Sequence, residues 1–486
     1  MKRLIFFCLL FLYYQSEGQP IRFRNYSVAE GLPSSTVRAI TQDDQGYLWF
    51  GTKNGISRFD GYQFKNFQYK KNDTSSLGNN FIHCITRIDS THLWIGTENG
   101  VYILDLEKEK FSHFGPPKEK TVYDIMRDKD GMIWFASRLN GLYRYDPVKR
   151  SLQHFRAGNS GLSSDEISRI AQDDDGNIWI GTFGSGIDIY NPSTGSFSNL
   201  RSATSGLSND YINIVYKGRD GVMWAGTWNG GLCKWQPRQR RFQVYRNDGS
   251  SNSIKDNIIR ALCQVAPDKI YIGTEKGLNV LDIATDRFTA YTNKADDPFS
   301  ISDNAIYSIF PDKAGTMWVG TFFGGASYFN EKGPAFELYY PTGEPDALSG
   351  RAVSCFLEDG PGKLWVGTED GGLQYFNTAT RRFQQYPFLP GQQKLSYHNI
   401  HTLLRDKAGK IWIGLFAGGV NVLDPKTGRV EYFQHQPGNI HSLNSNNVFC
   451  IYQDKDNKIW IGTDKGLDLY DSERHDFTRV LQDGVS

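Results

Sequence analysis

The chain has 486 residues and a nearly balanced charge, with 54 Lys and Arg against 53 Asp and Glu. A balance of this kind, without a basic stripe or an acidic tail, argues against nucleic acid and against a charged membrane surface as partners. The 50 glycines and the aromatic content of 14% are typical of many short strands joined by tight turns, and they do not fit a helical solenoid.

Residues 1–18 are predicted to be a signal peptide. Lys2 and Arg3 give a positive start, and an apolar run from Leu4 to Tyr14 leads to a cleavage site near Gly18. The apolar run is too short to span a bilayer. We therefore expect the segment to be removed on export and the mature chain to be periplasmic.

The rest of the chain repeats one phrase, in which an aromatic anchor is followed by an apolar residue and, in most copies, by Gly-Thr. The phrase returns ten times, at steps of 40 to 48 residues. The anchors are Trp49, Trp94, Trp134, Trp179, Trp224, Tyr271, Trp318, Trp365, Trp412 and Trp460. A period of this size with one fixed aromatic residue per unit indicates a repeated sheet module.

Each unit contains four apolar segments bounded by Gly, Asp, Asn or Pro. In the first unit the first segment is 36–42, and its apolar position Ile40 recurs in every copy as far as Ile451. An Asp-x-x-Gly turn leads to the anchor segment in most copies, and a glycine turn leads to the third segment. This spacing predicts a four-stranded antiparallel meander in each unit.

Such meanders are expected to form the blades of an all-β propeller, because one four-stranded sheet cannot bury both of its faces alone. The anchor rings are expected to act as structural blade anchors, wedged between adjacent sheets. The Gly-Thr after the anchor is interpreted as closing the anchor strand where a side chain would obstruct the turn.

The number of modules bears on how the blades are grouped. Propellers usually have about four to eight blades, and the expected arrangement is one seven-bladed ring at 19–335 and three blades of an incomplete second ring at 336–486. The segment 21–26 is predicted to supply the missing fourth strand of the last blade in the first ring. A single ten-bladed ring is the alternative. Because an unfinished ring exposes a sheet face, we expect the chain to be a fragment of a longer protein.

No pattern predicts a catalytic residue, a cofactor or a metal site. An enzyme is expected to break the repeat in one module to place a nucleophile or paired carboxylates at the axis, and only isolated polar residues occur. His83, His398 and His401 lie near first strands without a cysteine or carboxylate at metal-ligand spacing. Asp124 and Arg169 lie in a first-strand column placed to face the channel, and no role is assigned to them.

The turns between second and third strands differ from copy to copy and share one face of the propeller. Several carry an aromatic residue and one an arginine: Arg138, Phe183, Trp228, Phe322 and Phe416. Aromatic rings around a channel mouth can stack on the apolar faces of sugars while polar groups bind the hydroxyls. These five residues are the candidate ligand-binding ring. The alternative is that they pack against neighbouring loops or a second propeller.

The phrase resembles a known family of repeats. The stretch GLPSSTVRAITQDDQGYLWFGTKNGISRFDG at 31–61, and similar stretches at 161–182 and 445–466, resemble the two-component regulator propeller repeat. The resemblance implies the periplasmic sensor region of a hybrid histidine kinase that detects products of polysaccharide breakdown. It also implies a parent protein anchored in the inner membrane, with a β-sandwich, a membrane helix and a kinase for which this sequence shows no counterpart.

The predicted function is therefore the sensing of an oligosaccharide or another small ligand, with the signal passed to a kinase absent from this chain. Neither catalytic activity nor a cofactor is expected. A homodimer through the sensor region is a further expected partner, nucleic acid is not, and membrane contact is expected only through missing C-terminal segments. The alternatives are a secreted propeller enzyme, either a glycan hydrolase or a lyase, and a protein-binding scaffold.

Overall fold

The computed structural model describes residues 21–115, 120–331, 337–387 and 394–482. These residues form forty β-strands and one short helix, α1 (Ser202–Ser205). The predicted signal peptide lies outside the described residues. Within the described ranges no helix has the length and apolarity needed to cross a membrane. The chain divides into two compact units, Met1–Ala335 and Phe336–Ser486.

Every sheet is a four-stranded antiparallel meander, as the repeat predicts. The first sheet is β2 (Val37–Gln42), β3 (Leu48–Thr52), β4 (Gly55–Phe59) and β5 (Phe64–Phe67). The second is β6 (Ile82–Arg87), β7 (His92–Thr97), β8 (Gly100–Asp105) and β9 (Lys110–Phe114). The third is β10 (Val122–Arg127), β11 (Ile133–Ser137), β12 (Gly141–Asp146) and β13 (Ser151–Phe155). The fourth is β14 (Ile167–Gln172), β15 (Ile178–Thr182), β16 (Ile187–Asn191) and β17 (Ser196–Leu200).

Three further sheets complete the first unit. The fifth is β18 (Ile212–Lys217), β19 (Met223–Thr227), β20 (Leu232–Gln236) and β21 (Arg241–Tyr245). The sixth is β22 (Ile259–Ala266), β23 (Lys269–Thr274), β24 (Gly277–Asp282) and β25 (Arg287–Tyr291). The seventh is β26 (Ile306–Pro311), β27 (Thr316–Thr321), β28 (Ala326–Asn330) and, from the start of the chain, β1 (Arg24–Tyr26).

The second unit contains three sheets among its described residues. They are β29 (Val353–Glu358), β30 (Lys363–Thr368), β31 (Gly372–Asn377) and β32 (Arg382–Gln385); β33 (Ile400–Arg405), β34 (Ile411–Leu415), β35 (Gly419–Leu423) and β36 (Val430–Phe433); and β37 (Val448–Gln453), β38 (Ile459–Thr463), β39 (Gly466–Asp471) and β40 (Asp476–Gln482). Their first strands lie side by side, with β33 in contact with both β29 and β37.

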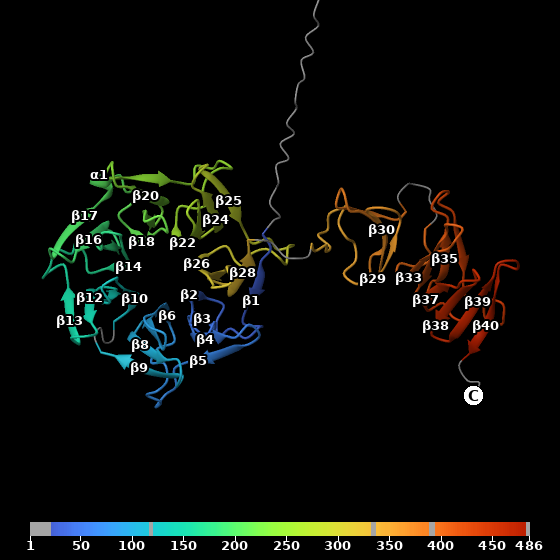
Figure 1. Ribbon diagram of the computed structural model, residues 1–486, viewed down its shortest axis with the longest axis horizontal. Helices are drawn as coiled ribbons and strands as arrows, with labels where there is room; N and C mark the ends of the chain where they lie inside the picture. Colours follow the sequence, from blue (N-terminus) through green and yellow to red (C-terminus); the bar gives the residue numbers. More distant parts are fainter. Residues whose placement is uncertain (1–20, 116–119, 332–336, 388–393, 483–486) are drawn as a thin grey trace, which may run out of the picture. The chain divides into compact units, whose positions relative to one another are not determined.

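The sheets of the first unit follow one another around a ring, as Figure 1 shows for the blue-to-yellow part of the chain. The first strands of successive sheets are in contact, and β26 of the seventh sheet also contacts β2 of the first. The early strand β1 pairs with β28, with Arg24 opposite Tyr328 and Tyr26 opposite Ala326. The predicted all-β propeller fold and the predicted pairing of the N-terminal strand are confirmed.

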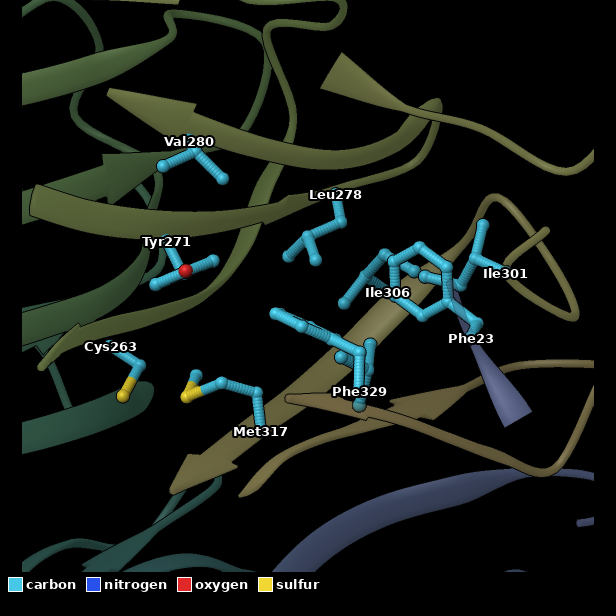
Figure 2. Packing of buried hydrophobic residues seen from close by; sticks show 10 residues of the cluster. Phe23, Cys263, Tyr271, Leu278, Val280, Ile301, Ile306, Met317 and Phe329 are labelled. Carbon is cyan, nitrogen blue, oxygen red and sulfur yellow. The ribbon is translucent and has the colours of Figure 1, made fainter. Parts of the chain in front are cut away.

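An aromatic residue just before β1 strengthens the attachment of this strand to the seventh sheet. Phe23 is buried and packs on Phe329 of β28 and Tyr291 of β25, with ring centroids 5.0 and 5.9 Å apart. Its N–H donates to the carbonyl of Phe299 at 2.8 Å. Figure 2 shows Phe23 beside Phe329 and Ile306 in the core between the sixth and seventh sheets. Phe23 is therefore part of the same apolar core as the seventh repeat.

The anchors lie on the second strands; nine are buried and Trp460 is half-buried. Trp49, for example, packs with Ile82 and Ile85 of the next sheet. In six copies the indole N–H also donates to the aspartate that opens the preceding turn, at 2.7–3.0 Å: Trp49 to Asp43, Trp134 to Asp128, Trp179 to Asp173, Trp318 to Asp312, Trp412 to Asp406 and Trp460 to Asp454. These hydrogen bonds fix the anchor ring to the turn that precedes it.

The glycine after the anchor lets adjacent sheets approach closely. A Cβ built on Gly51 would lie 2.7 Å from Cγ2 of Ile82, on the first strand of the next sheet. The turn is closed instead by the threonine, because Thr52 Oγ1 donates to the carbonyl of Gly55 at 2.8 Å. The interpretation of this glycine as a turn residue is therefore wrong. The glycine leaves room for the adjacent sheet, and only the threonine closes the turn.

Gly51→Ala is expected to lower the free energy of unfolding by about 1–3 kcal/mol, because the added methyl group forces the Ile82 side chain or its sheet to move. Urea denaturation followed by tryptophan fluorescence measures the change. Gly158→Ala is the matched control, since Gly158 is exposed and a Cβ there meets no atom within 4 Å. Equal free energies of unfolding for the two variants would show that a methyl group at residue 51 fits between the two sheets.

Asp128→Ala is expected to lower the free energy of unfolding by about 2–3 kcal/mol, because it leaves buried donors without an acceptor. Its carboxylate accepts hydrogen bonds from Trp134 Nε1 at 2.7 Å and from the N–H of Met132 at 2.8 Å. The exposed neighbour Asp130, changed to alanine, is the control in the same denaturation experiment. If both variants were equally stable, the aspartate would not be holding the anchor.

Candidate functional site

The first strand of every sheet contains a register shift at one fixed place, just before the fixed apolar position. In β2 the shift lies between Val37 and Ala39, so that Arg38 has no partner of its own on β3. A β-bulge of this kind turns a side chain away from the direction that strict alternation gives it. The residues in the bulges of the first unit differ from sheet to sheet: Arg38, His83, Tyr123, Ser168 with Arg169, Asn213, Arg260 and Tyr307.

The bulges of six sheets contribute to one cavity of about 390 Å³ in the first unit. Its lining residues are Arg38, Tyr123, Arg138, Glu166, Ser168, Arg169, Phe183, Asn213, Trp228, Arg260 and Tyr307. Because these come from the first strands and from the second-to-third turns, the cavity lies where the sheets converge. A second cavity of about 170 Å³ shares Arg38, Arg169, Arg260 and Tyr307 with it.

The structure brings three of the five predicted ring residues to this cavity: Arg138, Phe183 and Trp228. Phe322 does not line it, but stacks on the lining residue Tyr307 with ring centroids 5.2 Å apart. Phe416 lies in the second unit, where its ring is 5.6 Å from that of His401. Three of the five residues thus lie together at this cavity, and a ligand role for the five stays a prediction.

The aromatic side chains of the cavity offer flat apolar faces. Trp228 is 44% exposed, and its ring lies 4.6 Å from the guanidinium carbon of Arg260. Tyr123 and Phe183 meet edge to face, with centroids 6.1 Å apart. An exposed indole beside hydrogen-bonding groups is suited to a ligand that has both apolar and polar surfaces.

Four arginines supply most of the charge in the cavity: Arg38, Arg138, Arg169 and Arg260. Arg260 Nε lies 2.6 Å from Glu275 Oε1, and an Arg169 nitrogen lies 3.7 Å from Asp124 Oδ1. Arg169 also donates to the Tyr123 carbonyl. Asp124 in turn accepts from the N–H of Ile170 at 3.0 Å, which joins the third and fourth sheets. These two arginines are held by carboxylates behind the cavity.

Sequence reasoning missed Arg38, Arg260 and Tyr307 as site residues. They occupy the column two residues before the fixed apolar position, where the copies carry different side chains. That diversity is the signal that could have found them, because a position used only for packing between identical sheets has no reason to vary. Asp124 and Arg169, noted in the sequence without a role, form the ion pair described above.

His83 is the bulge residue of the second sheet, and the structure holds it uncharged. It packs against the rings of Phe81 and Tyr123, with centroids 4.8 and 4.7 Å apart. Burial and then the charges of Arg38 and Arg169 lower the pKa of His83 to about 2. Its contact with Glu98 at 4.0 Å is therefore not an ion pair at neutral pH. Among the described residues no group of histidine, cysteine and carboxylate side chains is placed to hold a metal ion.

The fold defines a β-propeller protein built from one repeated four-stranded sheet. Six segments match the family model described as "Two component regulator propeller": residues 31–54, 161–184, 206–229, 300–323, 347–370 and 442–465. The chain therefore carries repeats of the two component regulator propeller family, as the resemblance in the sequence predicts.

Proteins with related sequence or structure include sensor proteins. Histidine kinase P4 of Formosa agariphila is 33% identical over 73 residues, which are 15% of this chain and 5% of that protein. The extracellular domain of a hybrid two component system of B. thetaiotaomicron is 23% identical, with a TM-score of 0.63 over 96% of this chain and 61% of that one. A second such domain from the same organism is 24% identical, with a TM-score of 0.56 over 94% of this chain and 59% of that one.

The identities and the covered lengths show what these relatives share with the chain. At 23 and 24% identity the two solved structures establish a shared fold. The chain spans about 60% of the length of each, and a small part of the curated kinase. Both solved relatives are extracellular domains of their own parent proteins.

The unusual state of His83 predicts a pH dependence of stability. Below about pH 6.5 the unfolded chain binds a proton at this histidine and the folded chain does not, so stability is lost as the pH falls. Between pH 7 and pH 5 the wild type should lose about 2 kcal/mol more than His83→Gln. Urea denaturation at the two pH values measures the difference. Parallel losses in both proteins would mean that His83 is protonated in the fold.

Proposed function

We propose that the chain is the ligand-sensing region of a two-component system sensor, exported to the periplasm, and that it binds an oligosaccharide in the cavity of the first unit. The family repeats and the extracellular domains with the same fold support a sensor role. The observation that carries the ligand part of the proposal is the cavity itself, in which an exposed indole lies among groups able to hydrogen-bond hydroxyls.

The chemistry of the lining supports a sugar over a purely apolar ligand. Sugars present flat C–H faces together with many hydroxyls, and sites that hold them combine aromatic rings with polar side chains. Trp228, Phe183 and Tyr307 provide rings, while Glu166 and Asn213 provide acceptors and donors on neighbouring sheets. A cavity volume of about 390 Å³ lies within the usual range of about 300–1,000 Å³ for small-molecule sites.

In this proposal the chain itself carries no catalytic activity. Binding has to alter a region outside the chain, and the whole protein is proposed to be a membrane-anchored histidine kinase. The propeller presents a preformed cavity between rigid sheets, which suits recognition. Release of product from any glycan in the binding assay would favour instead the secreted enzyme considered from the sequence.

Trp228→Ala is expected to weaken binding of the oligosaccharide about tenfold, because an aromatic contact contributes about 0.5–1.5 kcal/mol beyond the area that it buries. A glycan array on the purified chain finds the sugar, and isothermal titration calorimetry compares the variants. Tyr62→Ala is the matched control, since Tyr62 is 95% exposed and lies in the turn between β4 and β5. Unchanged affinity in Trp228→Ala would remove the cavity from the proposal.

A further inference from the structure

The cavity of the first unit is unevenly charged. Its lining holds four guanidinium groups and one carboxylate, that of Glu166. Two of the arginines, Arg169 and Arg260, are paired with Asp124 and Glu275. Among the described residues no carboxylate is within ion-pair distance of the other two, Arg38 and Arg138. The cavity therefore keeps positive charge that the protein itself does not neutralise.

Arg38 shows this imbalance most clearly. Its Nε is buried, and no atom of the described residues accepts a hydrogen bond from it. Its guanidinium instead lies over the rings of Tyr307 and Phe81, 5.1 and 5.5 Å from their centroids. Burial and the charge of Arg169 lower the pKa of Arg38 to about 10, so it stays protonated at neutral pH. Arg38 is half-buried, and its guanidinium, which has no carboxylate partner among the described residues, is available to an anionic ligand.

Arg38 and Arg260 contact the same tyrosine ring although they come from the first and the sixth sheet. The guanidinium of Arg260 lies 5.0 Å from the centroid of Tyr307, the same ring that Arg38 covers at 5.1 Å. Arginine forks bind carboxylate and sulfate oxygens through paired N–H groups. Two guanidinium groups in contact with one tyrosine ring, one of them also 4.6 Å from the exposed ring of Trp228, form a site that combines positive charge with aromatic faces.

We propose that the ligand of this cavity is an acidic oligosaccharide, whose carboxylate or sulfate group is held by Arg38 and Arg260 while a sugar ring lies against Trp228. This inference rests on the proposed function, because it specifies the class of sugar. Arg138 is exposed and lies at the mouth of the cavity, where it attracts the anion from solution. Glu166 remains free to accept hydrogen bonds from sugar hydroxyls. A neutral sugar would leave the charge of Arg38 unpaired, so the geometry favours the acidic one.

The test is calorimetric titration of the whole chain with oligosaccharides of equal length: one with a uronate group, one with a sulfate ester and one neutral. Sodium sulfate serves as a bare anion. Acidic sugars should bind about tenfold or more tightly than the neutral one, and Arg38→Gln or Arg260→Gln should remove that preference. Arg238→Gln is the matched control, because Arg238 is exposed in the turn between β20 and β21. Comparison of the two acidic sugars shows whether the arginines bind the carboxylate or the sulfate more tightly.

The outcomes separate this inference from the function on which it rests. If neutral and acidic sugars bind equally and the arginine variants match wild type, the anion site is refuted and sugar sensing stands. If only sulfate binds, and Arg38→Gln abolishes it, the anion site stands and the sugar proposal fails. If nothing binds, both fail. Should Arg38→Gln lose the cooperative melting of the wild type, Arg260→Gln decides the result.

Discussion

The whole structure depends on the close approach of one sheet to the next. At Gly51 there is no space for a methyl group, because Ile82 of the adjacent sheet already occupies it. The anchor tryptophan fills the interface beside that contact, and an aspartate of the preceding turn fixes its indole in most copies. Dense packing of this kind tolerates little change in volume. That constraint explains why the phrase returns with so little variation.

The same constraint explains where variation is permitted. In six sheets of the first unit the bulge of the first strand releases a side chain from the interface and turns it toward the cavity. Arginine at position 38, serine at 168 and tyrosine at 307 therefore occupy equivalent places without disturbing the sheets. The turns between second and third strands have the same freedom. Recognition can thus change from one propeller to another while the packing of the sheets remains the same.

The fold could be predicted because its determinants are local and repeated. The spacing of the anchors and the Gly and Asp turns predict four strands per repeat, and even the pairing of the N-terminal strand follows from the count. The site could be predicted only in part. Arg138, Phe183 and Trp228 follow from their turn positions. Arg38 was missed because strict alternation places it on the same face as buried Ile40, and a bulge leaves no mark in a single sequence.

Two residues of the predicted ring do not line the cavity, and each has its own physical reason. Phe322 occupies an equivalent turn, yet its ring stacks on that of Tyr307. The ammonium group of Lys53 lies 3.9 Å from the centroid of the Phe322 ring. A preference of this sort depends on neighbours far apart in the sequence. Phe416 belongs to the second compact unit, and the cavity lies in the first. Contacts between side chains far apart in the sequence are what periodicity alone leaves open.

The central claim is that the variable bulge and turn positions of the first unit, and not its repeated frame, hold the ligand. The most direct measurement is a crystal structure of the chain with an oligosaccharide identified by binding. The account predicts electron density for the sugar in the cavity, with a ring against Trp228 and an oxygen within hydrogen-bond distance of Arg38. Density for the sugar anywhere else on the chain, with the cavity empty, would contradict it.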